Sequence, residues 1–443
     1  MAICISANVL YLHPIVVDDM AGEWFFDKMV NYNDVSNDTS QCIICKGARR
    51  LCGKDRCPLM IKFYSQSKTM KLIDATDIEG SSPPAVFVGG YGYPKVDIGP
   101  LIPPEFGDTS IMDKPELWGN KSIDEITDFR FRLVRGKYRI DATDFKKGGR
   151  IVDQVQEMAL IERPIDIEAR FSSKPKGRVI LDDEIQPFGP SARMDYMKAG
   201  NGRMHKYLER SFYDTDMKAA DAVLNAYRNG TLISEIQKAF SVGTMGIDRN
   251  RRFVPTRWSI TAVDDIIGKD LLKTTKHNNT IDEFRIYELH ALDNRWCILM
   301  MPCTWRFELI EAWYPNTTWN PSGRQIEMIS DCEFFDGRTE YAPIGGCYYA
   351  SRMAVNELLM KEKRTAGVVI FREAHPGYVM PVGVWNVRER VRESLTGNPF
   401  RFDNLESALQ HIDSVMDIPR KTWLQHSAVL RDYMIQRRID DYV

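Results

Sequence analysis

The sequence predicts an α+β protein: a mixed α/β multidomain body with a small four-cysteine knuckle near the N-terminus. The chain has 443 residues, 44% of them apolar, which is enough for two or three hydrophobic cores. Segments with helical periodicity alternate along it with short apolar segments typical of buried strands. Four of the nine cysteines gather between Cys42 and Cys57.

Four parts are expected along the chain. Near Asp282 the pattern changes from helical segments to long strand-like ones, which marks a boundary between domains. The predicted parts are an N-terminal segment with the knuckle at 42–57 (1–60), an N-terminal α/β domain (61–281), a C-terminal α+β domain (282–430) and a tail (431–443).

The knuckle reads C-x2-C-x6-C-x4-C, with Cys42, Cys45, Cys52 and Cys57 as the candidate ligands. Four thiolates at this spacing suit a tetrahedral, structural Zn²⁺ site that has no open position for catalysis. An iron–sulfur cluster is the competing interpretation, and free thiols in a loop are a third. The other five cysteines are scattered, which is typical of a protein from a reducing compartment.

In the N-terminal domain, Ala85–Val88 is predicted to be a buried strand that leads into a glycine-rich turn at 89–94. Pro94 and the β-type residues after it exclude the helix that a dinucleotide-binding loop would need. A tight turn is therefore expected, and the functional alternative is a bare backbone that lies close to a ligand or a nucleic-acid strand.

The residues from Phe129 to Ile140 alternate with basic side chains and are predicted to form a hairpin around Gly136. This is the densest positive region and the first candidate for phosphate contact, although a solvated charged face is the simpler interpretation. The candidate residues are Arg130, Arg132, Arg135, Lys137 and Arg139.

Helical periodicity follows at 151–161, 216–228, 231–240 and 261–273, and Thr261 with Asp264 resembles a capping box at the start of the last helix. Arg257 and Trp258, just before it, could clamp a phosphate and stack a base, or the tryptophan could simply be buried.

In the C-terminal domain, 283–292 and 295–313 are predicted strands joined at Asp293 and Asn294. A helix over 351–363 then leads into an apolar strand at 368–371.

Composition limits the possible functions. The formal net charge is -2, so any nucleic-acid binding must come from local patches. The acidic residues Asp182, Asp183, Asp264 and Asp265 could hold Mg²⁺ for hydrolysis, but nothing in the sequence ties them together. No histidine pair or nucleophile motif is present, so a catalytic site remains unknown. No segment has the flanks of a signal peptide or the length of a membrane span, and an intracellular, cytoplasmic protein is expected.

The C-terminal tail has the spacing of peptides that bind DNA sliding clamps. Gln436 is followed by Ile439 and Tyr442, and in a 3₁₀ turn side chains at i and i+3 form one apolar plug. Because Ile435, Ile439 and Tyr442 also stand at i, i+4 and i+7, the tail could instead be an amphipathic helix packed on the body.

Together, these features resemble the archaeal Nre DNA repair proteins over nearly the whole chain. The likeness rests on the knuckle, on Gly80–Gly89 and Tyr91–Val96, on Gly99–Pro100 and Gly107–Ser110, on Val254–Asp265 and on the tail. It implies a role in DNA damage repair, a C4-type zinc finger at the four cysteines and a peptide that binds the clamp (PCNA). That peptide comprises Gln436, Arg437, Arg438, Ile439, Asp440, Asp441, Tyr442 and Val443, with Val443 where the motif prefers an aromatic residue.

The sequence therefore predicts a repair factor that is recruited to the clamp and contacts DNA through a basic surface, associated with the nucleoid and not with a membrane. A metal-dependent nuclease or hydrolase that acts on damaged nucleic acid is one alternative. The other is an adaptor that bridges the clamp to other repair proteins.

Overall fold

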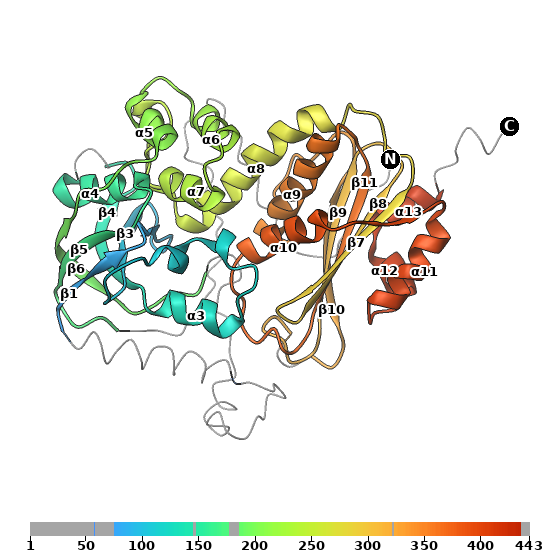
Figure 1. Ribbon diagram of the computed structural model, residues 1–443, viewed down its shortest axis with the longest axis horizontal. Helices are drawn as coiled ribbons and strands as arrows, with labels where there is room; N and C mark the ends of the chain where they lie inside the picture. The colour runs from blue at the N-terminus through green and yellow to red at the C-terminus, as the bar shows by residue number, and fades with distance from the viewer. Residues whose placement is uncertain (1–56, 58–74, 145–147, 177–185, 321–322, 436–443) are drawn as a thin grey trace. The chain divides into compact units, whose positions relative to one another are not determined.

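The computed structural model describes residues 57, 75–144, 148–176, 186–320 and 323–435 (Figure 1). By contacts these residues form two compact units, each described separately below. The N-terminal unit includes the described residues up to Ile267 and Met380–Asn386, and the C-terminal unit includes Gly268–Val379 and the described residues from Val387 on. Of the predicted zinc ligands only Cys57, which is half-buried, lies within this part of the chain. Cys42, Cys45, Cys52 and the tail 436–443 lie outside it.

The N-terminal unit contains a six-stranded sheet in the order β1-β5-β6-β4-β3-β2. Its neighbouring strands are antiparallel except for the parallel pair β4 and β6. The strands are β1 (Asp77–Ser82), β2 (Val86–Val88), β3 (Lys95–Ile102), β4 (Val134–Asp141), β5 (Ile165–Phe171) and β6 (Ser191–Ala199).

Each face of this sheet has its own hydrophobic cluster. Helix α4 (Gly149–Leu160) buries Val152, Val155 and Met158 in the larger cluster, together with alternate residues of the strands. The smaller cluster contains Phe87 and Leu101 of the sheet and Met112 of the 3₁₀ turn η1 (Ser110–Asp113), and Phe129 of α3 (Ile123–Phe131) packs against it. A second 3₁₀ turn, η2 (Pro115–Leu117), lies between η1 and α3 in the sequence. A complete capping box, Ser122 with Glu125, begins α3.

Four α-helices follow in this part of the chain, and most of them were predicted from the sequence. They are α5 (Lys206–Tyr213), α6 (Ala219–Arg228), α7 (Ile233–Ser241) and α8 (Thr256–Thr275). The predicted capping box at Thr261 and Asp264 is wrong, because α8 begins earlier, directly after Pro255, and both residues are buried inside it. Proline is well suited to a helix start, since its fixed φ fits the helix and its missing N–H is not needed there.

The predicted hairpin around Gly136 is also wrong. The chain runs straight through this glycine as strand β4, and the residues before it belong to α3. Gly136 is closely packed: a Cβ there would lie 2.7 Å from the sulfur of Met194 on the neighbouring strand β6, so that side chain would have to move. Glycine in this strand therefore marks a close approach and not a turn.

The C-terminal unit contains a second six-stranded sheet, in the order β10-β9-β11-β8-β7-β12. Strands β9 and β11 are parallel and the other pairs are antiparallel. The strands are β7 (Phe284–Ala291), β8 (Asn294–Met301), β9 (Arg306–Trp313), β10 (Glu327–Glu333), β11 (Gly367–Ala374) and β12 (Phe400–Phe402).

The strand pattern was predicted correctly in part. Leu292 and Asp293 have φ of 52° and 54°, so β7 and β8 are joined by a tight hairpin turn at the expected place. The single long strand predicted over 295–313 is instead two strands, because the chain turns after Met301 at Pro302.

Helices cover both faces of this sheet (Figure 1). On one face lie α9 (Gly346–Glu362) and α10 (Trp385–Thr396), which are linked by the Arg392–Glu357 ion pair at 2.7 Å. On the other face α11 (Leu405–Val415), α12 (Arg420–His426) and α13 (Ala428–Ile435) pack on the sheet in one hydrophobic cluster. Within the described residues, no helix combines the length and apolar character that crossing a membrane requires.

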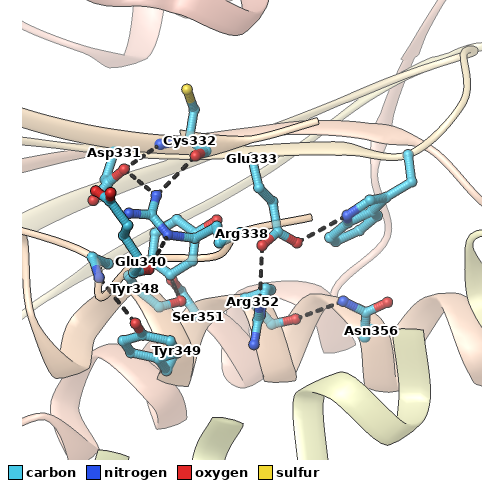
Figure 2. A network of polar contacts seen from close by, with 12 residues as sticks. Asp331, Cys332, Glu333, Arg338, Glu340, Tyr348, Tyr349, Ser351, Arg352 and Asn356 are labelled. Atoms are coloured by element: carbon cyan, nitrogen blue, oxygen red, sulfur yellow. Dashed lines mark hydrogen bonds and ion pairs between the residues drawn. The ribbon is translucent and has the colours of Figure 1, made fainter. Parts of the chain in front are cut away.

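A buried polar network connects β10 with α9 (Figure 2). The Glu333 carboxylate accepts hydrogen bonds from Trp305 Nε1 at 3.0 Å and Arg352 Nη1 at 2.8 Å, and neither the Glu333 nor the Arg352 side chain is exposed by more than 2%. Burial, reinforced by the negative charge of Glu333, raises the pKa of Tyr348 well above its ordinary value. The network is interior and fixes how α9 packs on the sheet.

Candidate nucleic-acid interface

The β2–β3 turn and the start of α8 are held together in the N-terminal unit. The backbone N–H of Val88 donates to Thr256 Oγ1 at 2.9 Å, and a Cβ on Gly90 would lie 3.5 Å from Pro255. The tight turn predicted at 89–94 is confirmed, since Lys95 N donates to the Gly92 carbonyl at 3.0 Å. Two segments that stand out separately in the sequence therefore meet in space.

Three aromatic side chains gather where these segments meet. Tyr91, at the tip of the turn, is 87% exposed. Tyr93 and Trp258 are half-buried, with ring centroids 5.2 Å apart and ring planes tilted by 53°. Burial raises the pKa of Tyr93, and a hydrogen bond and the positive charge of Arg252 oppose this shift. The exposed ring of Tyr91 and the half-buried pair of Tyr93 and Trp258 thus belong to adjoining segments, and unpaired bases can stack on aromatic faces of this kind.

Basic side chains lie at this turn, and the carboxylate of Asp97 lies there as well. Arg139 Nη1 donates to the Tyr91 carbonyl at 3.2 Å and lies 3.3 Å from Asp97 Oδ1, and its side chain is 40% exposed. Gly92, at φ 79°, lets the guanidinium approach the turn, because a Cβ would collide with it. We define the turn surface as Tyr91, Tyr93, Lys95, Arg139, Arg252, Arg257 and Trp258.

The structure brings together only some of the basic residues predicted to contact DNA. Arg139, Arg257 and Trp258 belong to the turn surface. Lys137 is half-buried two residues before Arg139 on β4, and alternation places both on the same face of the strand. The guanidinium of Arg135 lies over the rings of Phe87 and Phe188, 4.7 and 3.7 Å from their centroids.

Arg130 is a correction to the sequence prediction, because its side chain is buried in the N-terminal unit. It lies in α3, is 4% exposed, pairs with Asp113 and donates to the carbonyls of Met112 and Pro187 at 3.0 and 3.2 Å. Its donors are therefore used inside the fold and do not face a nucleic acid. Arg132 is partly exposed and pairs with Glu105.

The carboxylates considered for a nuclease site do not form one in the described part of the chain. Asp264 is fully buried inside α8, where Gln237 Nε2 donates to it at 3.3 Å. Asp182 and Asp183 lie outside the described residues. Tyr91 and Tyr93 were not among the residues predicted to contact nucleic acid, although two tyrosines in one glycine-rich turn are a usable signal.

Comparisons with known proteins match most of the chain to one family and to its curated members. The family described as "Archaeal Nre, N-terminal" matches residues 51–320, and "Archaeal Nre, C-terminal" matches residues 333–442. DNA repair protein NreB of Archaeoglobus fulgidus is 41% identical over 391 residues, which is 88% of this chain and 97% of that protein. DNA repair protein NreA of the same organism is 35% identical, covering 83% and 92%, and NreA of Haloferax volcanii is 31% identical, covering 81% and 88%. No solved structure is significantly similar to the chain.

Proposed function

The chain belongs to the archaeal Nre family, and on this basis we propose that it is a DNA repair factor that binds unpaired DNA on its turn surface and is recruited to the sliding clamp by its C-terminal peptide. The relatives named as DNA repair proteins align with it over 81–88% of its length. Such coverage supports a shared role for the whole chain.

The observation that carries the DNA contact is the turn surface itself. Single-stranded nucleic acid is bound by aromatic faces that stack bases and by cations that follow the phosphates. Tyr91 supplies an exposed ring, and Arg139 lies against the backbone of the same residue. A base stacked on Tyr91 would bring its phosphate within reach of this guanidinium.

The test is the binding of a fluorescent single-stranded oligonucleotide at several salt concentrations. Each phosphate contact with a single strand contributes about −0.7 to the slope of log K against log salt. Arg139→Gln should therefore weaken binding and make the slope shallower by about 0.7. Arg170→Gln is the matched control, because Arg170 is an exposed arginine of the same sheet that pairs with Asp77 at 2.8 Å, much as Arg139 pairs with Asp97. Equal slopes in both variants would refute the phosphate contact at Arg139, and no binding by the parent protein would favour the adaptor alternative.

The predicted C-terminal peptide follows α13 directly in the sequence. Ile435 is the last residue of this helix and is 79% exposed, and Met434 before it is 58% exposed. In the packed-helix alternative, Ile435 would be the first residue of the buried stripe that continues to Ile439 and Tyr442. The exposure of Ile435 supports the other interpretation, a peptide that is available to a partner.

Calorimetric titration against the cognate sliding clamp tests this recruitment. The double variant Ile439→Ala/Tyr442→Ala should lose clamp binding, because it removes both residues of the apolar plug. Met434→Ala, an apolar truncation on the exposed end of α13, is the control and should bind as the parent does. Unchanged affinity in the double variant would refute recruitment by this peptide.

We also propose that Cys42, Cys45, Cys52 and Cys57 hold one structural Zn²⁺, with an iron–sulfur cluster as the alternative. Metal analysis of purified protein should find one zinc per chain in addition to any weaker site. Iron with visible absorption would identify a cluster instead.

A further inference from the structure

Side chains that can ligate a metal converge in the C-terminal unit, where the parallel strands β9 and β11 end. The two strands finish in register, Trp313 opposite Ala374, and Tyr314 N then donates to the Ala374 carbonyl at 3.1 Å. Glu373 is the penultimate residue of β11, and His375 follows directly after the strand. Carboxyl ends of parallel strands are a common location for ligand sites.

Three ligand atoms lie close together there. His375 Nε2 is 3.2 Å from Glu373 Oε2 and 3.9 Å from Asp417 Oδ2, and the three groups offer ligand atoms within 4.8 Å of one another. Ligands bound to one ion at about 2.1 Å are separated by roughly 3.0 to 3.4 Å. A small movement of Asp417, whose side chain is 48% exposed, therefore completes the geometry.

Groups outside the cluster orient each of these ligands. Arg295 Nη1 forms an ion pair with Asp417 Oδ1 at 2.7 Å, so the other oxygen, Oδ2, is the one that faces His375. The backbone N–H of Ile418 donates to Glu373 Oε1 at 2.7 Å, while Oε2 accepts from Asp417 N at 3.1 Å and faces the imidazole. The ring of Tyr314 stacks on His375 with centroids 4.3 Å apart. Support of this kind is what holds metal ligands in place.

We infer that Glu373, His375 and Asp417 bind one divalent transition-metal ion. One imidazole nitrogen and two carboxylate oxygens suit Mn²⁺, Fe²⁺ or Zn²⁺, and the buried Glu373 would be anchored by its backbone hydrogen bonds. Three protein ligands leave coordination positions open on the side of the partly exposed Asp417, where water or a phosphate oxygen can bind.

The charges of the site agree with a cation. The carboxylates of Glu373 and Asp417 both face His375, and Arg295 pairs with Asp417 at 2.7 Å. The competing interpretation is a simple ion pair of protonated His375 with Glu373, which needs no metal.

A titration of the full chain with Mn²⁺ distinguishes the two interpretations. Electron paramagnetic resonance detects the binding, because the signal of free Mn²⁺ is lost when the ion binds to the protein. Mn²⁺ is the probe because thiolates favour softer ions, so the cysteine knuckle does not compete for it. The parent should bind one Mn²⁺ per chain at this site, and His375→Ala and Asp417→Asn should each weaken binding by at least about tenfold.

Two substitutions serve as matched controls and should leave Mn²⁺ affinity unchanged. His290→Ala removes an exposed imidazole of the β7–β8 hairpin that lies 4.0 Å from Asp293, and Asp413→Asn removes a carboxylate that pairs with Arg420 at 3.1 Å. If His375→Ala does not fold, the nearly isosteric Asp417→Asn decides the question. Parent-like affinity in Asp417→Asn, or no Mn²⁺ binding by the parent at millimolar concentration, would overturn the inference in favour of the ion pair.

Discussion

Replacing Tyr91 by alanine should weaken DNA binding without weakening the fold. The side chain is 87% exposed at the tip of the β2–β3 turn, so its truncation should change the free energy of unfolding by less than about 0.5 kcal/mol. Stacking of one base on an aromatic ring contributes about 1–3 kcal/mol. Tyr91→Ala should therefore raise the dissociation constant for a single-stranded oligonucleotide by about 5- to 150-fold.

Fluorescence anisotropy at fixed salt measures this change, with chemical denaturation in parallel to show that the fold is intact. Tyr91→Phe keeps the ring and should bind nearly as the parent does. Tyr213→Ala is the matched control, because Tyr213 is 69% exposed at the end of α5 in the same unit but lies outside the turn surface. An equal loss of affinity in Tyr213→Ala, or none in Tyr91→Ala, would refute the assignment of the DNA contact to the turn.

Three further predictions concern buried charges and are all measured by chemical denaturation. Arg130→Ala should lower the free energy of unfolding by about 3 kcal/mol, because it leaves Asp113 buried without its main partner; a loss below 1 kcal/mol would mean that Arg130 is not buried as described. Arg352→Met should lower it by about 3–5 kcal/mol, since Glu333 loses its partner in the network of Figure 2, and parent-like stability would count against that ion pair. Burial raises the pKa of the Glu308 carboxyl above its ordinary value of 4.5. The stability that this carboxyl contributes is therefore fully present below pH 4.5 and is lost as the pH rises through the raised pKa. Glu308→Gln should flatten this dependence of the free energy of unfolding on pH, and an unchanged pH profile would contradict the prediction.

The elements that could be predicted from the sequence are those whose signals are local. The periodicity at 151–161 was enough to locate α4, and the apolar run at 368–371 was enough to locate β11. Gly136 was misread because a turn and a close approach look alike along the chain, and only the sulfur of Met194 on another strand distinguishes them. Similarly, Arg130 belongs to a run of alternating basic residues, yet its burial depends on Asp113, Met112 and Pro187, which are distant in sequence.

The candidate sites show the same division between local and long-range information. The glycine-rich turn and Arg257–Trp258 both stand out in the sequence, but their meeting depends on the contact of Val88 with Thr256 across most of the unit. Glu373 and His375 are close in sequence to one another and distant from Asp417, so no local spacing could reveal that they converge.

Photocrosslinking followed by mass spectrometry tests the central claim most directly, because it maps the DNA contact on the unmodified protein. An oligonucleotide that carries 5-iodouracil couples on irradiation to aromatic side chains stacked on that base. We predict crosslinks at Tyr91 or Trp258 that disappear when salt is raised enough to abolish binding. Crosslinks found only outside the turn surface would contradict the proposed interface.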